Sequence, residues 1–559
     1  MNEQERILFN ELRKDRIESA DVLDKQSMAG VKKSVVEKYS DQAHFVYELL
    51  QNADDAGATY AKFTLYPDKI VFVHNGSRHF SITDYRTEAD DAQNHCLGDI
   101  NAITSVGNSS KRSDDDVGKT IGKFGIGFKS VFQYTSTPEI YDDNFFFRIE
   151  RFFVPCEILI DYDGRHPGET VFVLPFNHEQ MPQNEAYKEI RETLKDLKYP
   201  VLFMPHLSKI YFECDNERIE YSKEIEDKLY FGDVTAELVC QSNKGNDTEV
   251  VDRLWLFSRD ALEGYSYSVG FFLTEDGHLK PVKEPAFCFF LTMESTELNF
   301  VIQAPFLLTD NRANIFANKA HNKKLVELLA QLAADSLIYL KKIGISKGVN
   351  LIDDKFFAIL PYDESLYKVD EKKKISFEPF YLKIKDCLSR EDILPTSDGF
   401  CCADDACWAS VSRLTELFTS SHISVLFNHP NLKWVFPSLG RDEYQKSNRK
   451  VAKYINSIVP LWLDESKIIK KIDENFIDRQ SFEWLSSLYK WLGETDSRIK
   501  QVKKKPIFLN QEKKAIAAYD ANGKNILFIA DENNAGNYDY VFQDFLEDPE
   551  IRGRCPKVS

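Results

Sequence analysis

The sequence predicts an α+β protein whose N-terminal part is a mixed, largely antiparallel sheet with helices on one face. Two alternating apolar segments, 62–67 and 69–76, are joined across a Pro-Asp-Lys turn, which is typical of a β-hairpin. Two later segments of the same kind, 145–152 and 169–176, supply further strands. A segment of helical period, 42–57, precedes them and offers a helix to cover the sheet.

The helix predicted over 42–57 has one apolar and one polar face. Its apolar residues recur at the spacing of a core-facing stripe: Val46, Leu49, Leu50 and Ala53. At roughly 100° per residue, Glu48, Asn52 and Asp55 fall within about 60° of one another on the opposite side. An Asn oxygen suits a hard Mg²⁺ ion, and a carboxylate one turn away can orient or deprotonate water. The spacing therefore predicts a cleft for metal-assisted phosphate chemistry.

The segment 122–130, GKFGIGFKS, places three glycines in the pattern G-x-x-G-x-G before an expected helix start. Glycine lets a backbone approach phosphate closely, and the N–H groups of a helix N-terminus bind anions. Lys123 and Lys129 are expected to add positive charge. A Walker A loop is excluded because Ser113 stands where its first glycine should be. A Rossmann fingerprint is excluded because its glycines follow the reverse order.

Together, ELLQNADDAGA at 48–58 and IGKFGIGFKS at 121–130 match, in order and spacing, two boxes of the GHKL or Bergerat-fold ATPases. The chain resembles that superfamily, which includes gyrase, the ninety-kilodalton heat-shock chaperone, histidine kinases and MutL. The resemblance implies ATP and Mg²⁺ as cofactors, with Glu48 as general base, Asn52 as the Mg²⁺ ligand and Asp55 as the acid that reaches the nucleotide. It also implies a nucleotide-binding loop made of Lys123, Phe124, Gly125, Ile126, Gly127 and Phe128.

A third box departs from the superfamily, in which an Asp-x-Gly-x-Gly segment ends a strand and the Asp binds the adenine amine. Here the strand ends in His74, Asn75 and Gly76. Aligning the glycine puts His74 at the Asp position, and either His74 or Asn75 is expected to contact the base. Neither reproduces a carboxylate acceptor, so the base selectivity stays open. Thr170 resembles the strand Thr whose hydroxyl helps to seat adenine.

The segment 105–120, rich in Gly, Ser and charge, stands where the superfamily has its ATP lid, which we expect over about 84–120. With the His-Asn-Gly box, it looks most like the sacsin and NO VEIN type branch, which includes bacterial proteins associated with antiphage defence. The segment 300–315 resembles a recurring segment of that branch. There Arg312 is expected to reach the γ-phosphate, since an Arg fork is suited to phosphate.

Composition limits the class of protein. A length of 559 residues favours two to four domains, and a net charge of −18 argues against a non-specific nucleic-acid binder. Nucleic acid is therefore not favoured as a partner. No signal peptide or membrane-length apolar run is visible, and ten irregularly spaced cysteines indicate free thiols, so we expect a cytoplasmic protein without membrane contact. Cys401, Cys402 and Cys407 lack zinc-site pairing and are interpreted as structural.

Pattern shifts divide the chain into four parts. They are a helical segment at 1–30, a GHKL-type ATP-binding domain at 31–184, a transducer-like α/β domain at 185–345, and an α+β region of unassigned role at 346–559. The tail stops without a closing element, and proteins of the resembled type are often longer. We therefore expect the N-terminal part of a larger protein.

These observations favour slow, Mg²⁺-dependent ATP hydrolysis that drives a lid and domain switch, with a chaperone-like or antiphage-defence output. The expected partner is a second copy, in a nucleotide-dependent dimer, or a protein client. Two alternatives stay open. One is a nucleotide-gated interaction module with little turnover, favoured by the altered box at His74. The other is a MutL-like DNA-transaction ATPase, favoured by the match at 48–58 and opposed by the acidic charge.

Overall fold

The computed structural model describes residues 1–25, 45–94, 96–105, 127–260, 266–309, 314–370, 373–529 and 538–553. The protein is α+β and divides into two compact units. Unit 1 comprises Met1–Ala333 and Tyr367–Pro379, and unit 2 comprises Ala334–Leu366 and Phe380–Ser559.

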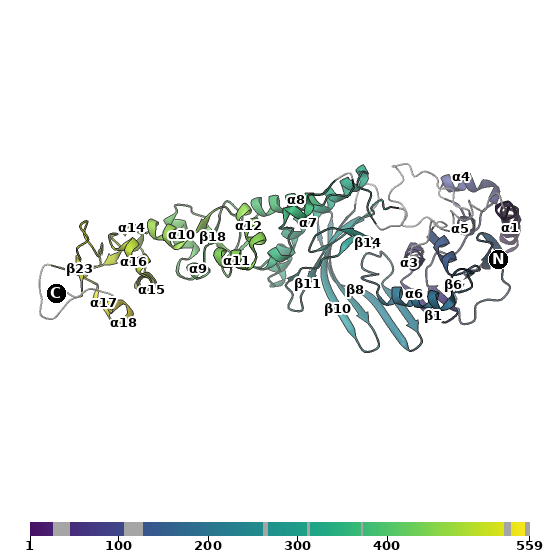
Figure 1. Ribbon diagram of the computed structural model, residues 1–559, viewed down its shortest axis with the longest axis horizontal. Helices are drawn as coiled ribbons and strands as arrows, with labels where there is room; N and C mark the ends of the chain where they lie inside the picture. Colours follow the sequence, from purple (N-terminus) through teal and green to yellow (C-terminus); the bar gives the residue numbers. More distant parts are fainter. Residues whose placement is uncertain are drawn as a thin grey trace. The chain divides into compact units, whose positions relative to one another are not determined.

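Unit 1 is built on one 15-stranded sheet. Figure 1 labels several of its strands, among them β8, β10 and β11. Its strands are β1 Tyr60–Tyr66, β2 Lys69–His74, β3 Glu139–Tyr141, β4 Phe146–Glu150, β5 Val154–Glu157, β6 Thr170–Pro175, β7 Lys209–Cys214, β8 Glu217–Phe231, β9 Val234–Lys244, β10 Glu249–Asp260, β11 Ser266–Leu273, β12 Leu279–Lys280, β13 Pro285–Cys288, β14 Phe290–Ser295 and β15 Val301–Gln303. They lie in the order β14, β13, β15, β11, β10, β9, β8, β7, β1, β2, β6, β3, β4, β5, with β12 paired to β11.

Antiparallel pairing dominates this sheet, as predicted. Among the described strands of unit 1, the parallel pairs are β1 with β7 and β13 with β15. The pairing of β1 with β7 joins the N-terminal strands to the long strands β8, β9 and β10. One hydrogen-bonded sheet therefore continues through the two parts that sequence patterns separate at residues 184 and 185.

The helical elements of unit 1 are α1 Glu3–Leu23, α3 Phe45–Asp55, η2 Tyr85–Thr87, α4 Glu88–Gln93, α5 Asp99–Ile103, η3 Gly127–Gln133, α6 Gln183–Lys195 and α7 Ala320–Lys347, which continues into unit 2. Of these, α1, α3, α5, η3 and α6 contribute side chains to the core on one face of the N-terminal strands. The main core takes Ile70 and Phe72 from β2 and Leu49 and Leu50 from α3, whereas Val71 joins a separate cluster on the other face. The alternation along β2 thus confirms the α+β architecture with helices on one side.

The apolar stripe of α3 is buried as the sequence predicts, with each of its four residues at most 1% exposed. Burying a Leu side chain stabilises a fold by about 1.5–3 kcal/mol. Helix α1 also packs on the main core through apolar side chains. Its N-terminus has a capping box, in which the Asn2 side chain accepts from Glu5 N at 2.8 Å and Asn2 N donates to the Glu5 carboxylate at 2.8 Å. Phe9 and Leu12 then enter the main core.

Unit 2 combines short strands with amphipathic helices, as predicted for the C-terminal region. Its strands are β16 Leu394–Thr396, β17 Gly399–Cys401, β18 Ala406–Ala409, β19 Lys433–Val435, β20 Trp462–Leu463, β21 Phe508–Leu509, β22 Ala515–Ile516, β23 Leu527–Phe528 and β24 Asp539–Tyr540. Its helical elements are η4 Phe356–Ile359, η5 Glu364–Tyr367, α8 Glu378–Arg390, α9 Arg413–Leu417, α10 Ser420–Leu426, α11 Arg441–Ser447, α12 Arg449–Ile458, α13 Glu465–Lys471, α14 Glu474–Ile477, α15 Phe482–Gly493, α16 Asp496–Val502, α17 Gln543–Leu546 and α18 Pro549–Arg552.

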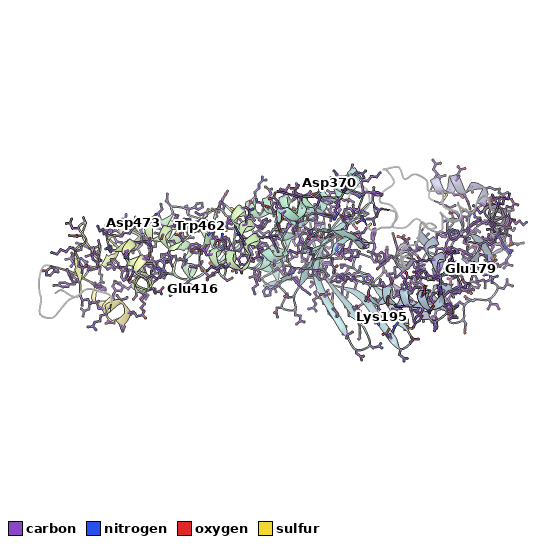
Figure 2. The ribbon with its side chains drawn as sticks, viewed as in Figure 1. Glu179, Lys195, Asp370, Glu416, Trp462 and Asp473 are labelled. Carbon is purple, nitrogen blue, oxygen red and sulfur yellow. The ribbon has the colours of Figure 1, made fainter. Side chains whose placement is uncertain are left out.

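Five strands of unit 2 form one sheet in the order β17, β16, β19, β18, β20. Trp462 of β20, labelled in Figure 2, is covered by two cations, since Lys467 Nζ lies 3.2 Å and Arg441 Cζ 4.3 Å from its ring centroid. Such contacts attract through the quadrupole of the ring. In the described part of the chain, none of the helices combines the length and the apolar character needed to span a bilayer.

Asp54 anchors α3 to the distant start of β7. The side chain is 1% exposed, and its Oδ1 accepts from His206 N at 2.8 Å and from Leu207 N at 2.7 Å. These bonds give an acceptor to two backbone N–H groups just before β7, one at the buried Leu207 and one at the exposed His206. Asp54 therefore has a structural role beside its neighbour Asp55.

Replacing Asp54 with Ala is expected to lower the free energy of unfolding of unit 1 by about 1–3 kcal/mol, because the buried Leu207 N–H and the part-buried His206 N–H lose their acceptor. Urea unfolding followed by hydrogen exchange of unit 1 peptides measures this change. Asp68→Ala, at the exposed turn between β1 and β2, is the matched control and should change stability by less than about 0.5 kcal/mol. Equal effects of the two substitutions would contradict the anchoring role.

Candidate functional site

Helix α3 ends in a tight cap. Ala58 N donates to Ala53 O at 2.9 Å, Gly57 N donates to Asp54 O at 2.8 Å, and Gly57 has a φ of 77°. These are the two bonds of a Schellman motif, whose left-handed position favours glycine. The cap turns the chain directly from α3 into β1.

The loop formed by His74, Asn75 and Gly76 packs against this end of α3. A Cβ on Gly76 would lie 2.7 Å from Ala56 Cβ and 3.0 Å from Ala56 O, so only glycine fits. The Asn75 amide is occupied by the start of β1, since its Oδ1 accepts from Thr59 N at 2.9 Å and from Tyr60 N at 3.1 Å. The structure therefore brings the predicted His-Asn-Gly box and the predicted helix together.

The polar residues of α3 are less exposed than polar residues on the outer face of a surface helix. Glu48 is 6% and Asn52 7% exposed, whereas Asp55 is half-buried. The Asn52 amide makes no hydrogen bond to any residue that the structure describes. Buried polar side chains nearly always have partners, so an amide left over at the end of a helix is a candidate ligand-binding group.

His74 and Thr170 lie opposite each other on β2 and β6. His74 is 4% exposed, and burial lowers its pKa to about 4, so the imidazole is neutral at pH 7. Its Nδ1 accepts from Gly76 N at 3.1 Å, and its ring stacks on Phe172 with centroids 6.1 Å apart. The pair therefore occupies the face of the sheet that carries α3.

Asp142 is a residue of this site that sequence reasoning missed. It follows β3, is fully buried, and accepts from Thr170 Oγ1 at 2.7 Å, from Phe80 N at 2.8 Å and from His79 Nδ1, whose ring nitrogen lies 2.9 Å away. The only signal in the sequence is a carboxylate directly after a short strand. Its partners come from two places far from it in the chain, the adjacent His79 and Phe80 and the strand residue Thr170.

The glycine-rich segment is described from Gly127 onward, where it forms the 3-10 helix η3 rather than an α-helix. Phe128 is buried in the main core, with its ring centroid 6.0 Å from that of Phe172. Lys123, Phe124, Gly125 and Ile126 lie outside the described residues, as does Arg312.

Lys129 departs from the expectation that it adds charge beside a phosphate. Its Nζ is buried and donates to Ile103 O at 2.7 Å, at the end of α5, and to Phe152 O at 3.0 Å. Burial lowers the pKa of this ammonium group to about 7. Lys129 therefore joins η3 to α5 and to the turn between β4 and β5.

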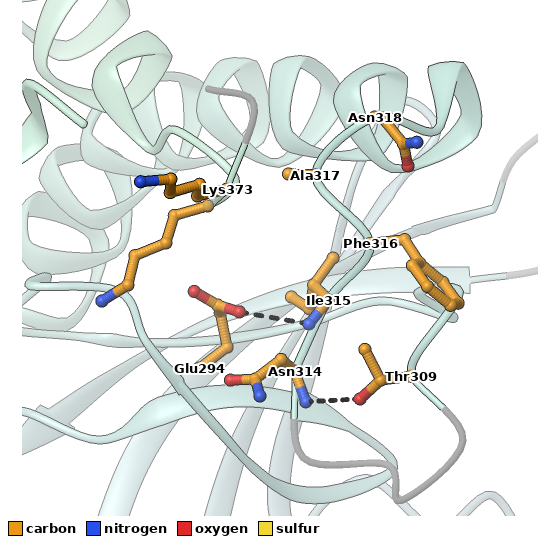
Figure 3. A pocket seen from close by; sticks show the side chains of 9 residues that line it. Glu294, Thr309, Asn314, Ile315, Phe316, Ala317, Asn318 and Lys373 are labelled. Atoms are coloured by element: carbon orange, nitrogen blue, oxygen red, sulfur yellow. Dashed lines mark hydrogen bonds between the residues drawn. The ribbon is translucent and has the colours of Figure 1, made fainter. Parts of the chain in front are cut away.

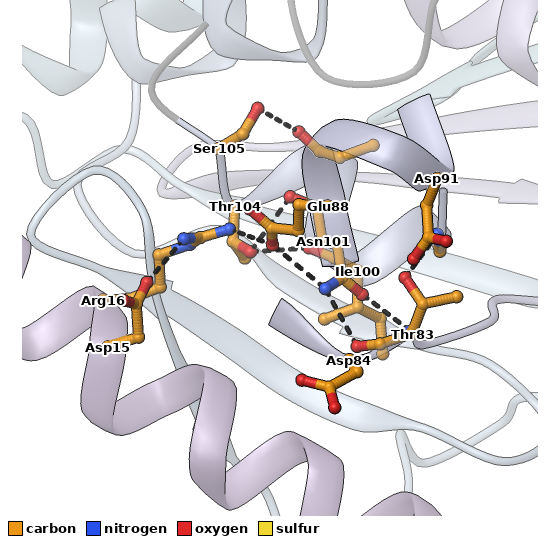
Figure 4. A network of polar contacts seen from close by, with 12 residues as sticks. Asp15, Arg16, Thr83, Asp84, Glu88, Asp91, Ile100, Asn101, Thr104 and Ser105 are labelled. Atoms are coloured by element: carbon orange, nitrogen blue, oxygen red, sulfur yellow. Dashed lines mark hydrogen bonds and ion pairs between the residues drawn. The ribbon is translucent and has the colours of Figure 1, made fainter. Parts of the chain in front are cut away.

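A polar network fixes α1 to the described part of the predicted lid region (Figure 4). Arg16 of α1 pairs with Glu88 of α4 and, at 2.7 Å, with Asp15. Asn101 of α5 donates to Glu88 Oε1 at 3.0 Å and to Thr83 O at 3.0 Å. The helices before residue 106 are thus held to α1 by a buried guanidinium group.

A cavity of about 420 Å³ lies beside Thr309 and Asn314 (Figure 3). It is lined by Glu294, Thr309, Asn314, Ile315, Phe316, Ala317, Asn318, Lys373 and Lys374. Ile315 N donates to Glu294 Oε2 at 3.1 Å, and Asn314 N donates to Thr309 Oγ1 at 3.2 Å. Leu308 and Ile315 form an antiparallel bridge, so the flanks of the predicted polar turn are paired.

The cysteine cluster of unit 2 is buried rather than arranged around an ion. Burial raises the pKa of the Cys401 thiol to about 12 and also raises that of Cys407. Across the described ranges, no group of three or more His, Cys, Asp or Glu side chains is placed to hold a metal ion.

Comparison with known proteins relates this site to two large proteins. A family model described as "Sacsin domain" matches residues 25–149, which contain α3, the His-Asn-Gly box and the glycine-rich segment. The chain is 26% identical over 333 residues to Protein NO VEIN of Arabidopsis thaliana, a match that covers 54% of this chain and 11% of that protein. It is 32% identical over 112 residues to human Sacsin, covering 20% of this chain and 2% of Sacsin. The N-terminal region is therefore similar to the Sacsin domain and to part of Protein NO VEIN, and the chain matches only a small part of the length of either relative.

Gly76→Ala is expected to lower the free energy of unfolding by about 1–3 kcal/mol, because its Cβ would overlap Ala56. Urea unfolding of unit 1 measures the loss. Ala56→Gly removes the nearest atom, so the double variant should recover part of the stability that Gly76→Ala loses. Purely additive losses in the double variant would show that the two positions are not in contact.

Lys129 predicts a pH dependence of stability. Its pKa is about 7 when folded and 10.5 when unfolded, so the unfolded chain binds more protons between those values and stability rises with pH there. Relative to Lys129→Met, the wild type should gain up to about 1.4 kcal/mol per pH unit above pH 7. Urea unfolding of both proteins from pH 6 to pH 9.5 tests this, and parallel curves would contradict it.

Proposed function

We propose that unit 1 binds ATP with Mg²⁺ and hydrolyses it slowly. The proposal is carried by one observation: Glu48 and Asn52 lie one turn apart on α3 and are only 6% and 7% exposed. Two further observations support it. The end of α3 abuts the His-Asn-Gly loop, and residues 25–149 match the Sacsin domain.

The residues present fit the proposed cofactors. Asn52 offers a neutral oxygen to Mg²⁺, which keeps several waters and phosphate oxygens as its other ligands. Bound Mg²⁺ supplies neutralisation of phosphate charge. Glu48 orients and deprotonates the attacking water as general base, and Asp55 reaches the nucleotide. The loop from Lys123 to Phe128 holds the phosphates, and Arg312 contacts the γ-phosphate.

The output we propose is a conformational switch. Nucleotide binding closes the predicted lid at about 84–120, whose described helices are tied to α1 through Arg16 and Glu88. A second copy of the chain, or a protein client, then binds the closed state. The protein acts in the cytoplasm as a chaperone-like or antiphage-defence protein. A module that binds nucleotide with little turnover is the second candidate, favoured by the neutral His74 where the superfamily has a carboxylate.

Single-turnover hydrolysis of labelled ATP with Mg²⁺ tests the proposal, because it detects a slow catalyst. Glu48→Ala and Glu48→Gln should lower the rate by about 10²–10⁴-fold while ATP still binds, as expected for a general base. Asn52→Ala should instead abolish the Mg²⁺-dependent part of binding. Asp68→Ala, at the opposite end of β1 and β2, should retain the wild-type rate.

Each outcome separates the candidates. Cleavage that disappears in both Glu48 variants supports the ATPase. Binding without cleavage in the wild type favours the nucleotide-gated module. Equal loss of binding in the Glu48 and Asn52 variants would remove Glu48 from the role of base, and the absence of any nucleotide binding would overturn both candidates.

A further inference from the structure

We infer that His74 and Thr170 recognise the edge of a purine base as a donor and acceptor pair, in which His74 donates a hydrogen bond and Thr170 accepts one. The inference rests on the proposed nucleotide site and specifies how that site selects its base. A carboxylate at position 74 would accept a hydrogen bond from the base, whereas His74 donates one.

The donor character of His74 follows from its tautomer. Gly76 N donates to His74 Nδ1 at 3.1 Å, so Nδ1 carries the lone pair and the proton of the neutral ring sits on Nε2. Burial disfavours the charged ring. No residue in the described part of the chain accepts a hydrogen bond from Nε2. The imidazole therefore presents one N–H group to a ligand.

The acceptor character of Thr170 follows from its contact with Asp142. The Thr170 hydroxyl donates to Asp142 Oδ1 at 2.7 Å, which uses its single proton. Asp142 is held in place by Phe80 N, at 2.8 Å from Oδ2, and by His79 Nδ1, at 2.9 Å from Oδ1. Thr170 Oγ1 is left with lone pairs, and the described residues supply no donor to them.

The two groups are side by side. His74 and Thr170 are directly opposite in the antiparallel pair of β2 and β6, so their Cβ atoms are about 4.5–5.5 Å apart on one face. Gly76, which fixes the tautomer, also rests on the end of α3 that carries Asn52. The pair is therefore positioned by the same elements as the proposed phosphate chemistry.

A purine offers the complementary pattern in two ways. Adenine presents N1 as acceptor and its 6-amino group as donor, while a 6-oxopurine such as guanine presents O6 as acceptor and N1–H as donor. An N–H group at position 74 cannot bond an amine hydrogen, whereas an Asp there would accept one. Recognition at position 74 therefore depends on an acceptor atom of the base, which is N1 if the base is adenine.

Equilibrium binding of ATP, GTP, 1-deaza-ATP and 7-deaza-ATP with Mg²⁺ to the full wild-type chain tests this inference. The comparison of ATP with GTP identifies the base. If ATP binds more tightly, 1-deaza-ATP should bind at least about tenfold more weakly, because a buried donor is left unpaired. The analogue 7-deaza-ATP, which lacks a nitrogen on the other ring, should bind like ATP.

A variant tests the same donor for either base. His74→Phe keeps a ring beside Phe72 and Phe172 but removes the N–H, so the preferred nucleotide should bind about tenfold more weakly, and ATP and 1-deaza-ATP should become equal. The exposed His166→Phe is the matched control and should bind like the wild type.

The outcomes separate this inference from the proposed function. Equal affinities of the wild type for ATP and 1-deaza-ATP, with ATP preferred over GTP, would overturn the donor role of His74 while leaving a nucleotide site intact. Unchanged binding of the preferred nucleotide by a folded His74→Phe protein would do the same. Failure of every nucleotide to bind the wild type would remove the proposed function and the inference together.

Discussion

The candidate site depends on how closely the backbone after β2 approaches the end of α3. Gly76 leaves no room for a side chain against Ala56, and Gly57 turns the helix directly into β1. Because α3, β1 and β2 follow one another in the chain, this contact closes a short local unit. Every polar group of the candidate site described on α3, β2 and β6 takes its position from that unit or from a strand paired to it.

Buried polar groups in unit 1 fall into two kinds. Asp54, Asp142 and Lys129 are each satisfied by groups far away in the sequence, so their burial contributes to the fold. The Asn52 amide and the Nε2 of His74 make no such bonds with the described residues. Groups of the second kind are available to hydrogen-bond a ligand, and the proposed nucleotide site is built on them.

Local patterns were sufficient to predict the α3 stripe and the β1 and β2 hairpin, whereas the placement of the helix beside the His-Asn-Gly box was implied by the family resemblance. Period and turn chemistry act over a few residues, so one sequence carries that information. The parallel pairing of β1 with β7 was not predictable, since residues about 150 positions apart in the printed sequence must meet. The hydrogen-bond partners of Lys129 and Asp142 could not be predicted for the same reason, because they belong to other elements.

The unbroken ladder of unit 1 has a mechanical consequence. From β5 through β2 and β1 to β8 and β10, neighbouring strands are joined by backbone hydrogen bonds along one path. Shearing one strand of such a sheet past the next would break a row of hydrogen bonds. A change of twist strains each bond only slightly, so the sheet deforms by twisting. A displacement at the end of β2 would therefore spread as torsion to the long strands β8, β9 and β10, and the farthest strand would carry the sum of many small rotations.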